Sequence, residues 1–297
     1  MDVLRTACSA IGTIEPEVDM KQKGGVYEVT DEGLVINGNI YNNQIDKMKE
    51  YGETFDQSTN TVNVLSSSPY KMTPVNVDGE GDFEASLQLP EGKETGKFTL
   101  NYYDQAVNGM KDHPDQTYDL IREGTPYAKL SSTKSDAKYG ESLSLNLSSH
   151  HTSIHGATYD VRYDNSVYEE FDVTISEELR AFADEQGVEI VTEAKDSVVS
   201  GTRTTIPVTL TVNGELNEDI PNGMNLLDIH VKVKQTPDLY KKWIYPIELT
   251  KSEVTSSTGE TSVIQSFGKG INILPTHSQL EGGFLPDGFT DGVWLRP

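Results

Sequence analysis

Cysteine, basic residues and long apolar runs are all scarce in this chain. Cys8 is the single cysteine among 297 residues, which excludes an intrachain disulfide and a multi-cysteine zinc site. The 24 Lys and Arg stand against 47 Asp and Glu, giving a net charge of -23, and this acidic excess argues against binding to nucleic-acid phosphates. No run approaches the roughly 18 apolar residues of a spanning helix, so we expect no membrane span.

Short alternating apolar segments, separated by Gly, Asn, Asp and Pro, predict a mainly β chain. Residues 83–89 place Phe, Ala and two Leu side chains on one face, and residues 97–103 repeat the alternation. Two further strands are expected at 34–41 and 61–65. One face of each strand must be buried, so we expect a second sheet to pack against the first and form a β-sandwich.

The second half of the chain carries enough strand patterns for a second sandwich. Leu143, Leu145 and Leu147 alternate with polar residues. Further strands are expected at residues 157–163, 171–175, 188–192, 204–212, 226–234 and 245–251. Pro207 lacks a backbone donor, so the sequence predicts that its strand lies at a sheet edge.

One helix is expected within the second sandwich, at residues 177–186. Ser176 is a suitable N-cap, and Gly187 can adopt the left-handed conformation that ends a helix. Leu179, Phe182 and Ala183 form a narrow apolar stripe that predicts packing on a sheet. A short helical turn is also expected from Pro237.

These patterns divide the chain into four parts. Residues 1–30 form an N-terminal segment, residues 31–124 an immunoglobulin-like sandwich, and residues 125–252 a cohesin-like sandwich. Residues 253–297 form a C-terminal extension or the start of a next module. We expect the chain to be a piece of a longer protein.

Two clusters offer metal chemistry. Asp78, Glu80 and Asp82 alternate as at the start of an EF-hand loop, which predicts calcium binding, but Leu87 occupies the place of the bidentate carboxylate. The same residues also suit a plain turn before the strand at 83–89. His151 and His155 lie four residues apart and would bind zinc from a helix, whereas the residues between them favour a loop.

Particular segments resemble known families. Residues 156–169 are similar to cohesin-like sandwiches, in which an alternating strand ends in a Tyr-Asp-x-Ser-Val turn, here Tyr163 to Val167. Residues 77–83, with the loop at 104–109, resemble bacterial immunoglobulin-like modules that combine an Asp-Gly-x-Phe turn with an Asp-x-Ala-x-Asn loop. The tandem resembles the region that follows the catalytic domain of large secreted subtilisin-like serine peptidases.

This resemblance implies a secreted or cell-wall location and a non-catalytic role. The parent chain's catalytic domain would be one partner, and an extracellular protein or glycan another. Cohesins bind dockerins through a sheet face, but no residue pattern identifies such a face here. Adhesion or scaffolding is the alternative function, and an unrecognised hydrolase is the third. Because Tyr and Arg are enriched at binding hot spots, the candidate binding surface comprises Tyr159, Arg162, Tyr163 and Tyr168.

Overall fold

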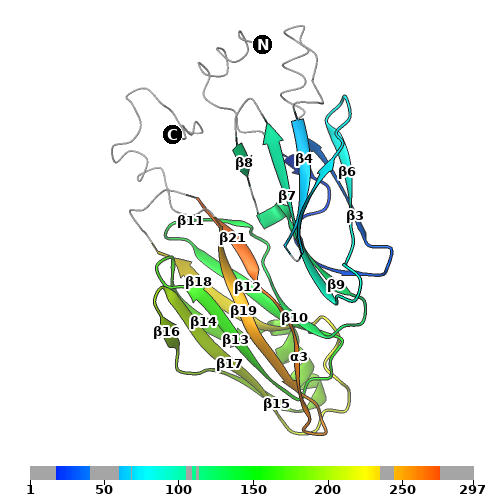
Figure 1. Cartoon of the computed structure of the whole chain (residues 1–297). Coiled ribbons are helices and arrows are strands. Elements are labelled where there is room, and N and C mark those ends of the chain that lie inside the picture. The colour runs from blue at the N-terminus through cyan, green and yellow to red at the C-terminus, as the bar shows by residue number, and fades with distance from the viewer. Residues whose placement is uncertain are drawn as a thin grey trace. The chain divides into compact units, whose positions relative to one another are not determined.

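The computed structural model describes residues 18–40, 60–67, 69–104, 109–111, 114–234 and 244–274. The chain divides into two compact units between Glu123 and Gly124, named here the first unit and the second unit (Figure 1). Both units consist mainly of β-strands, which confirms the predicted fold class. No helix among the described residues is long and apolar enough to cross a membrane.

The first unit is a sandwich of two unequal sheets. The smaller sheet has the order β1-β3-β6, with β1 at Val18–Met20, β3 at Leu34–Ile40 and β6 at Asp82–Leu87. The larger sheet has the order β2-β9-β7-β4-β5, and β8 pairs with β7. Its strands are β2 (Gly25–Val29), β4 (Asn60–Ser67), β5 (Tyr70–Val75), β7 (Thr95–Asp104), β8 (Gly109–Lys111) and β9 (Thr117–Arg122). A short 3-10 helix, η2 at Pro114–Gln116, precedes β9.

The core of the first unit lies between these two sheets. Along β6, Phe83, Ala85 and Leu87 are buried and alternate with exposed residues, as the sequence predicts. They belong to one cluster with Leu100 of β7 and Leu120 of β9 from the larger sheet. Pairing of apolar faces across the two sheets therefore holds this unit together.

The second unit contains thirteen described elements and forms a larger sandwich. One layer has the order β14-β18-β12-β10 and the other β15-β17-β13-β19, with β16 beside β17. β20 pairs with both β10 and β19 and so joins the layers at one side. The elements are β10 (Tyr127–Ser131), β11 (Asp136–Lys138), β12 (Ser142–His150), β13 (Gly156–Asp164), β14 (Tyr168–Ile175), α3 (Glu177–Gln186), β15 (Glu189–Ala194), β16 (Val198–Ser200), β17 (Arg203–Asn213), β18 (Asn225–Val233), β19 (Ile244–Thr255), β20 (Thr261–Phe267) and β21 (Lys269–Leu274).

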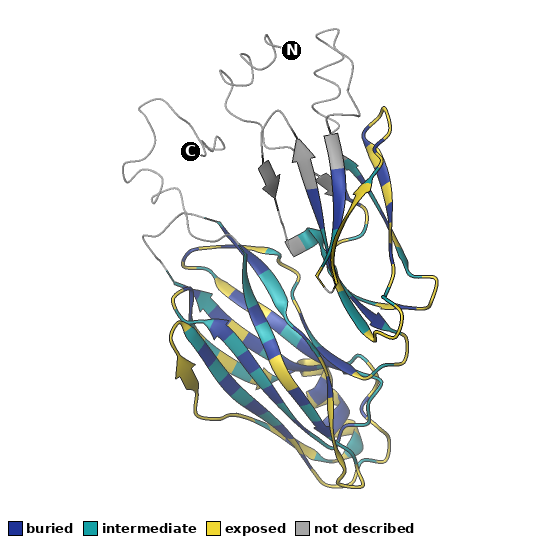
Figure 2. Cartoon of the chain, viewed as in Figure 1, coloured by how far each residue is buried: buried dark blue, intermediate teal, exposed yellow. Residues whose placement is uncertain are grey.

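Buried and more exposed positions alternate along the long strands of this unit (Figure 2). In β13 and β17 every second residue is buried, which places one face of each strand in the core. The core includes Leu145 of β12, Val161 of β13 and Ile229 of β18, all fully buried.

The helix α3 matches its prediction closely. Ser176 is in an extended conformation and its hydroxyl accepts a hydrogen bond from the Leu179 amide, while Gly187 ends the helix at a φ of 69°. Leu179, Phe182 and Ala183 are the buried residues of the helix. Both caps are local interactions, so the sequence was sufficient to predict them. The turn expected from Pro237 lies outside the described residues.

Two predicted domain boundaries differ from the structure. β1 and β2 precede residue 31 but pair with β3 and β9, so they belong to the first unit. β20 and β21 follow residue 252 but pair with β10, β11 and β19, so they belong to the second unit. These partners are distant in sequence, and a reading by local periodicity could not assign them.

The edge position predicted for Pro207 is wrong. Its strand, β17, lies between β13 and β15. The Pro207 carbonyl accepts a hydrogen bond from the Lys195 amide, so the missing donor also points to the β15–β16 side. There β15 pairs only as far as Val208 and β16 only from Thr205, which leaves a gap opposite Pro207. An interior strand tolerates proline here because the neighbouring strand is interrupted.

Candidate functional site

The three tyrosines predicted for a binding surface are buried in the second unit. Tyr159 is 0% exposed, Tyr163 8% and Tyr168 1%. Tyr159 and Ser149 share a hydrogen bond of 2.8 Å between their hydroxyls, and the Tyr168 hydroxyl donates to the Tyr245 carbonyl at 2.8 Å. Burial raises the pKa of both phenols. The predicted surface is therefore wrong for these residues, which form part of the core.

Strand geometry explains the error. Successive side chains of a strand point to opposite faces, so Tyr159 and Tyr163 lie on the face opposite Arg162. The tyrosines occur with Val161 in an apolar alternation, and this signal in the sequence was enough to place them inside. Arg162 alone of the predicted set points outward, to the outer face of the β15-β17-β13-β19 layer.

This outer face, named here the threonine face, is four strands wide. The β13 positions Thr158, Asp160 and Arg162 pair in register with Thr209, Pro207 and Thr205 of β17. All six side chains are half-buried, as expected for the solvent side of a sheet. Val191 and Val198, on β15 and β16, add exposed apolar area at the sheet margin, with exposures of 40% and 64%. The face therefore combines short, uncharged side chains with a few charges.

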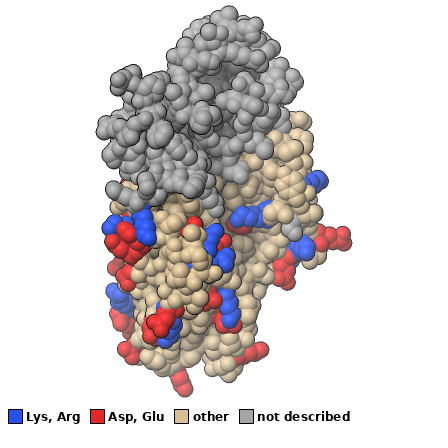
Figure 3. Space-filling view, turned by 60° about the vertical axis from the view of Figure 1, so that its left-hand side comes forward, with Lys and Arg blue, Asp and Glu red and all other residues tan. Residues whose placement is uncertain are grey.

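The basic side chains of the threonine face are paired with carboxylates. Arg162 Nε lies 2.8 Å from Glu248 Oε2, and Arg203 lies 3.8 Å from the same carboxylate. Lys251 forms a 2.8 Å ion pair with Glu253, and the hydrogen bond to Glu253, together with the charges of Glu253 and Asp160, raises the pKa of Lys251. Basic and acidic side chains also lie next to one another on the face of the chain seen in Figure 3. The threonine face thus presents no unpaired basic side chain among these residues, whereas Asp160 forms no ion pair with a described residue.

The predicted calcium residues form a turn between β5 and β6. The Asp78 carboxylate accepts hydrogen bonds from the amides of Glu80 and Asp82, both at 2.9 Å. Asp82 in turn accepts from the side-chain amide of Asn39 at 2.7 Å. Within the described ranges, no group of three or more His, Cys, Asp or Glu is placed to hold a metal ion. Calcium binding at these residues stays a prediction, and the turn accounts for their spacing.

The histidine cluster is the loop that the sequence favoured. β12 ends at His150, whose ring stacks on Tyr127 with centroids 4.3 Å apart and contacts the Ser148 hydroxyl at 3.2 Å. His151 has a positive φ of 52°, and its amide donates to the Asn222 side chain. His151 and His155 do not lie in a helix, which the zinc hypothesis requires. His230 is exposed on β18.

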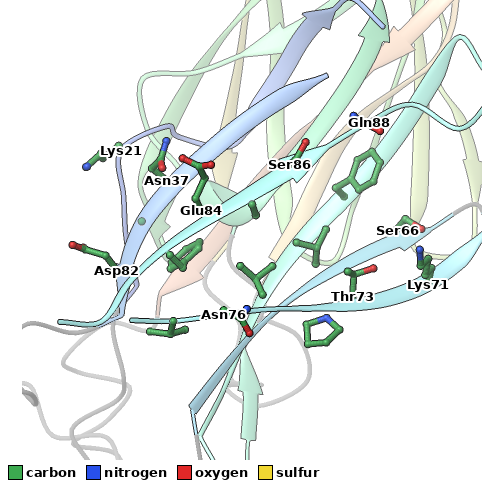
Figure 4. A pocket seen from close by; sticks show the side chains of 18 of the residues that line it. Lys21, Asn37, Ser66, Lys71, Thr73, Asn76, Asp82, Glu84, Ser86 and Gln88 are labelled. Carbon is green, nitrogen blue, oxygen red and sulfur yellow. The ribbon is translucent and has the colours of Figure 1, made fainter. Parts of the chain in front are cut away.

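A groove of about 1,090 Å³ lies in the first unit, where its two sheets separate beside β5 and β6 (Figure 4). Its floor is apolar and includes Val64, Phe83 and Phe98. Glu84 and Ser86 line it from β6, and Figure 4 shows Lys71 and Thr73 along the opposite wall. The groove was not predicted because β5 carries no clear strand pattern in the sequence and its pairing depends on the whole sandwich.

Comparisons with known proteins give matches only among solved structures. No protein-family model matches the chain. No curated protein matches either. Three similar structures are a cohesin module of a family 33 glycoside hydrolase from Clostridium perfringens, a type II cohesin from the Acetivibrio cellulolyticus cellulosome, and a type I cohesin of Clostridium thermocellum in complex with a dockerin. Their identities are 14%, 12% and 12%, with TM-scores of 0.38, 0.37 and 0.36. They cover 51%, 50% and 50% of this chain and 98%, 95% and 99% of their own.

Proposed function

We propose that this chain is a non-catalytic protein-binding module and that the threonine face is its binding surface. The observation that carries the proposal is an open sheet face whose basic side chains are already paired with carboxylates. A partner that covers such a face does not have to desolvate isolated cations, and burying an unpaired charge is costly. Threonine, proline and valine also lose little side-chain entropy on burial.

The dimensions of the face suit a protein partner. The eleven residues of β17 extend over about 35 Å, and four strands are about 15 Å wide, which gives roughly 500 Å². Weak and transient protein complexes bury less than about 1,200 Å² in total, or about 600 Å² on each partner. The face is the outer side of a sheet, and a small molecule needs a concave site to bury most of its surface. A folded protein therefore fits this surface better than a small ligand.

Paired substitutions on the two layers test the surface. The whole chain is immobilised and used to capture proteins from the secreted fraction of its source. Thr158→Arg combined with Thr209→Arg places two long cations in the centre of the threonine face. The matched control, Ser144→Arg with Thr174→Arg, places the same groups at exposed positions on the outer face of the other layer.

A partner retained by the wild type and the control but lost by the Thr158→Arg/Thr209→Arg variant supports the proposal. Equal retention by both variants overturns the threonine face as the surface. Hydrolysis of casein or of cell-wall glycans by the chain itself would overturn the non-catalytic assignment. A circular-dichroism melt of each variant confirms that the fold is intact.

The finer proposal concerns the parent protein. We propose that the chain is an accessory region of a secreted or wall-associated subtilisin-like serine peptidase, where it positions the catalytic domain or docks substrate. Its support is a resemblance in the sequence alone: residues 77–83 are similar to immunoglobulin-like modules and residues 156–169 to cohesin-like sandwiches, and this tandem resembles the region after the catalytic domain of such peptidases. An antibody to the chain should detect a band much larger than 33 kDa that also reacts with a fluorophosphonate probe. A parent band that stays unlabelled beside an active control would refute the peptidase assignment.

A further inference from the structure

The groove of the first unit exists because its two sheets differ in width. The smaller sheet ends at β6, while the larger sheet continues through β4 to β5. The inward-facing side chains of β5 therefore lack a covering strand among the described residues, and Lys71 and Thr73 remain exposed. The uncovered space beside β6 has the position of a fourth strand of the smaller sheet (Figure 4).

The backbone of β6 is oriented to accept such a strand. Phe83, Ala85 and Leu87 pair with Gly38, Ile36 and Leu34 of β3. The Asp82 carbonyl, in contrast, accepts from the Asp78 amide on the other side of β6. Because alternate residues direct their backbone groups to alternate sides, Glu84 and Ser86 direct theirs away from β3. Val77 forms a bridge with Phe83 on that side, so the edge of β6 is open from Ser86 onward. At Ser86 no described residue takes up these groups on that side.

The walls of the groove carry opposite charges at its two ends. Asp78, Asp82 and Glu84 lie toward the turn that joins β5 to β6, together with Lys21, which leaves an acidic excess there, and Lys71 lies toward the other end (Figure 4). Glu84 and Lys71 are exposed and form no ion pair with a described residue. An antiparallel strand beside β6 would run toward the turn, so its C-terminal end would meet the acidic side chains. Its N-terminal end would lie near Lys71.

We infer that the groove binds an extended polypeptide segment as an added strand antiparallel to β6. The segment has apolar residues at alternate positions, which contact Val64, Phe83 and Phe98. It carries basic residues at its C-terminal end and an acidic residue at its N-terminal end. Main-chain hydrogen bonds to Ser86 hold it, and the alternate side chains and the two charged ends select it. The site lies in the first unit and does not depend on the threonine face.

The test uses two synthetic peptides with blocked ends and a fluorescent label. In the first, an N-terminal Glu precedes a Val-Thr-Val-Thr-Val segment that ends in two Lys; in the second, the charges are reversed. Fluorescence anisotropy with the whole chain should give a Kd of about 100 µM or lower for the first peptide. The second should bind at least about tenfold more weakly at low salt, because like charges would then face one another. No saturable binding of the first peptide up to about 1 mM, or equal binding of both, overturns the inference.

Two variants separate strand addition from other binding. Ser86→Pro removes an amide that the fold does not use but the added strand needs, so binding should fall about tenfold. Glu84→Lys should weaken the first peptide and improve the second. The control Glu185→Lys makes the same charge change at an exposed position on α3 and should leave both affinities unchanged. The Thr158→Arg/Thr209→Arg variant should also bind the first peptide normally, which keeps this test independent of the proposed function.

Hydrogen exchange gives a readout that does not depend on variants. Bound peptide should slow amide exchange at residues 86–88, where the added strand would pair. Exchange there that is unchanged at saturating peptide would show that the peptide binds elsewhere and would refute the inference.

Discussion

At the residue scale, Gly268 marks the point where the chain passes from β20 to β21. A Cβ atom at this position would lie 2.5 Å from the Ile247 carbonyl oxygen and 2.8 Å from the Glu248 Cα, both backbone atoms of β19. Gly268→Ala should therefore destabilise the second unit by about 2 kcal/mol, the usual cost of forced overpacking. Urea unfolding of the whole chain measures it. At Gly156 a Cβ would make only ordinary contacts, so Gly156→Ala should change stability by less than about 0.5 kcal/mol.

Asp119 makes a pH-dependent contribution. Burial raises the pKa of its carboxyl, and the neighbouring Lys97 opposes this only in part. The folded state therefore holds this proton to a higher pH than the unfolded state, and stability falls as the pH rises above the ordinary value of 3.8. Asp119→Asn should accordingly raise stability at pH 7 more than at pH 4. The exposed Asp172→Asn is the control, and an equal effect of Asp119→Asn at both pH values would contradict the prediction.

The tyrosines show what single residues reveal in a sequence. The alternation from Ala157 to Tyr163 predicted a strand correctly. The same alternation also indicates which side chains of that strand are buried. Grouping Arg162 with Tyr159 and Tyr163 ignored the two-residue period, and this produced the wrong surface. Asp78 shows a different limit, because the same alternating acids suit a cation loop and a turn. In the structure the Asp78 carboxylate accepts from the Glu80 and Asp82 amides, which forms the turn, and calcium binding stays a prediction.

At the scale of single elements, α3 depends on one side chain at its start. The Ser176 hydroxyl accepts from the Leu179 amide and donates to the Asn225 carbonyl, so it ties the helix to the start of β18. Ser176 is 1% exposed, and its loss leaves two buried polar groups without partners. Ser176→Ala should cost about 2 kcal/mol in urea unfolding, the upper end for a lost N-cap. Ser142→Ala, at an exposed serine with no side-chain hydrogen bond among the described residues, should cost less than about 0.5 kcal/mol.

Elements were predictable where their signals are local. The caps of α3 and the alternation of β6, β13 and β17 follow from neighbouring residues and were found. The central position of β17 was missed because Pro207 is tolerated only through a gap between β15 and β16, a feature of the sheet. The threonine face and the groove were missed for the same reason, since both arise from strand order.

At the scale of the whole molecule, the second unit needs its last two strands. β20 joins the two layers through β10 and β19, and β21 pairs with β11 and β19. Without them, buried side chains such as Ile247 would face water, and β10 and β19 would each lose a partner. A chain of residues 124–279 should therefore unfold in one cooperative transition.

A chain of residues 124–252, which ends at the boundary expected from local patterns, should show no such transition. Loss of Ile264, Phe267, Ile271 and Ile273 removes apolar burial worth several kcal/mol, which is comparable to the whole stability of a domain. Thermal unfolding followed by circular dichroism, with near-ultraviolet signal as the measure of fixed packing, compares the two chains. Cooperative unfolding of the shorter chain at a similar midpoint would mean that β20 and β21 contribute little to the stability of the sandwich. The loss of the transition would show that strands placed at opposite ends of the unit's sequence close one common core.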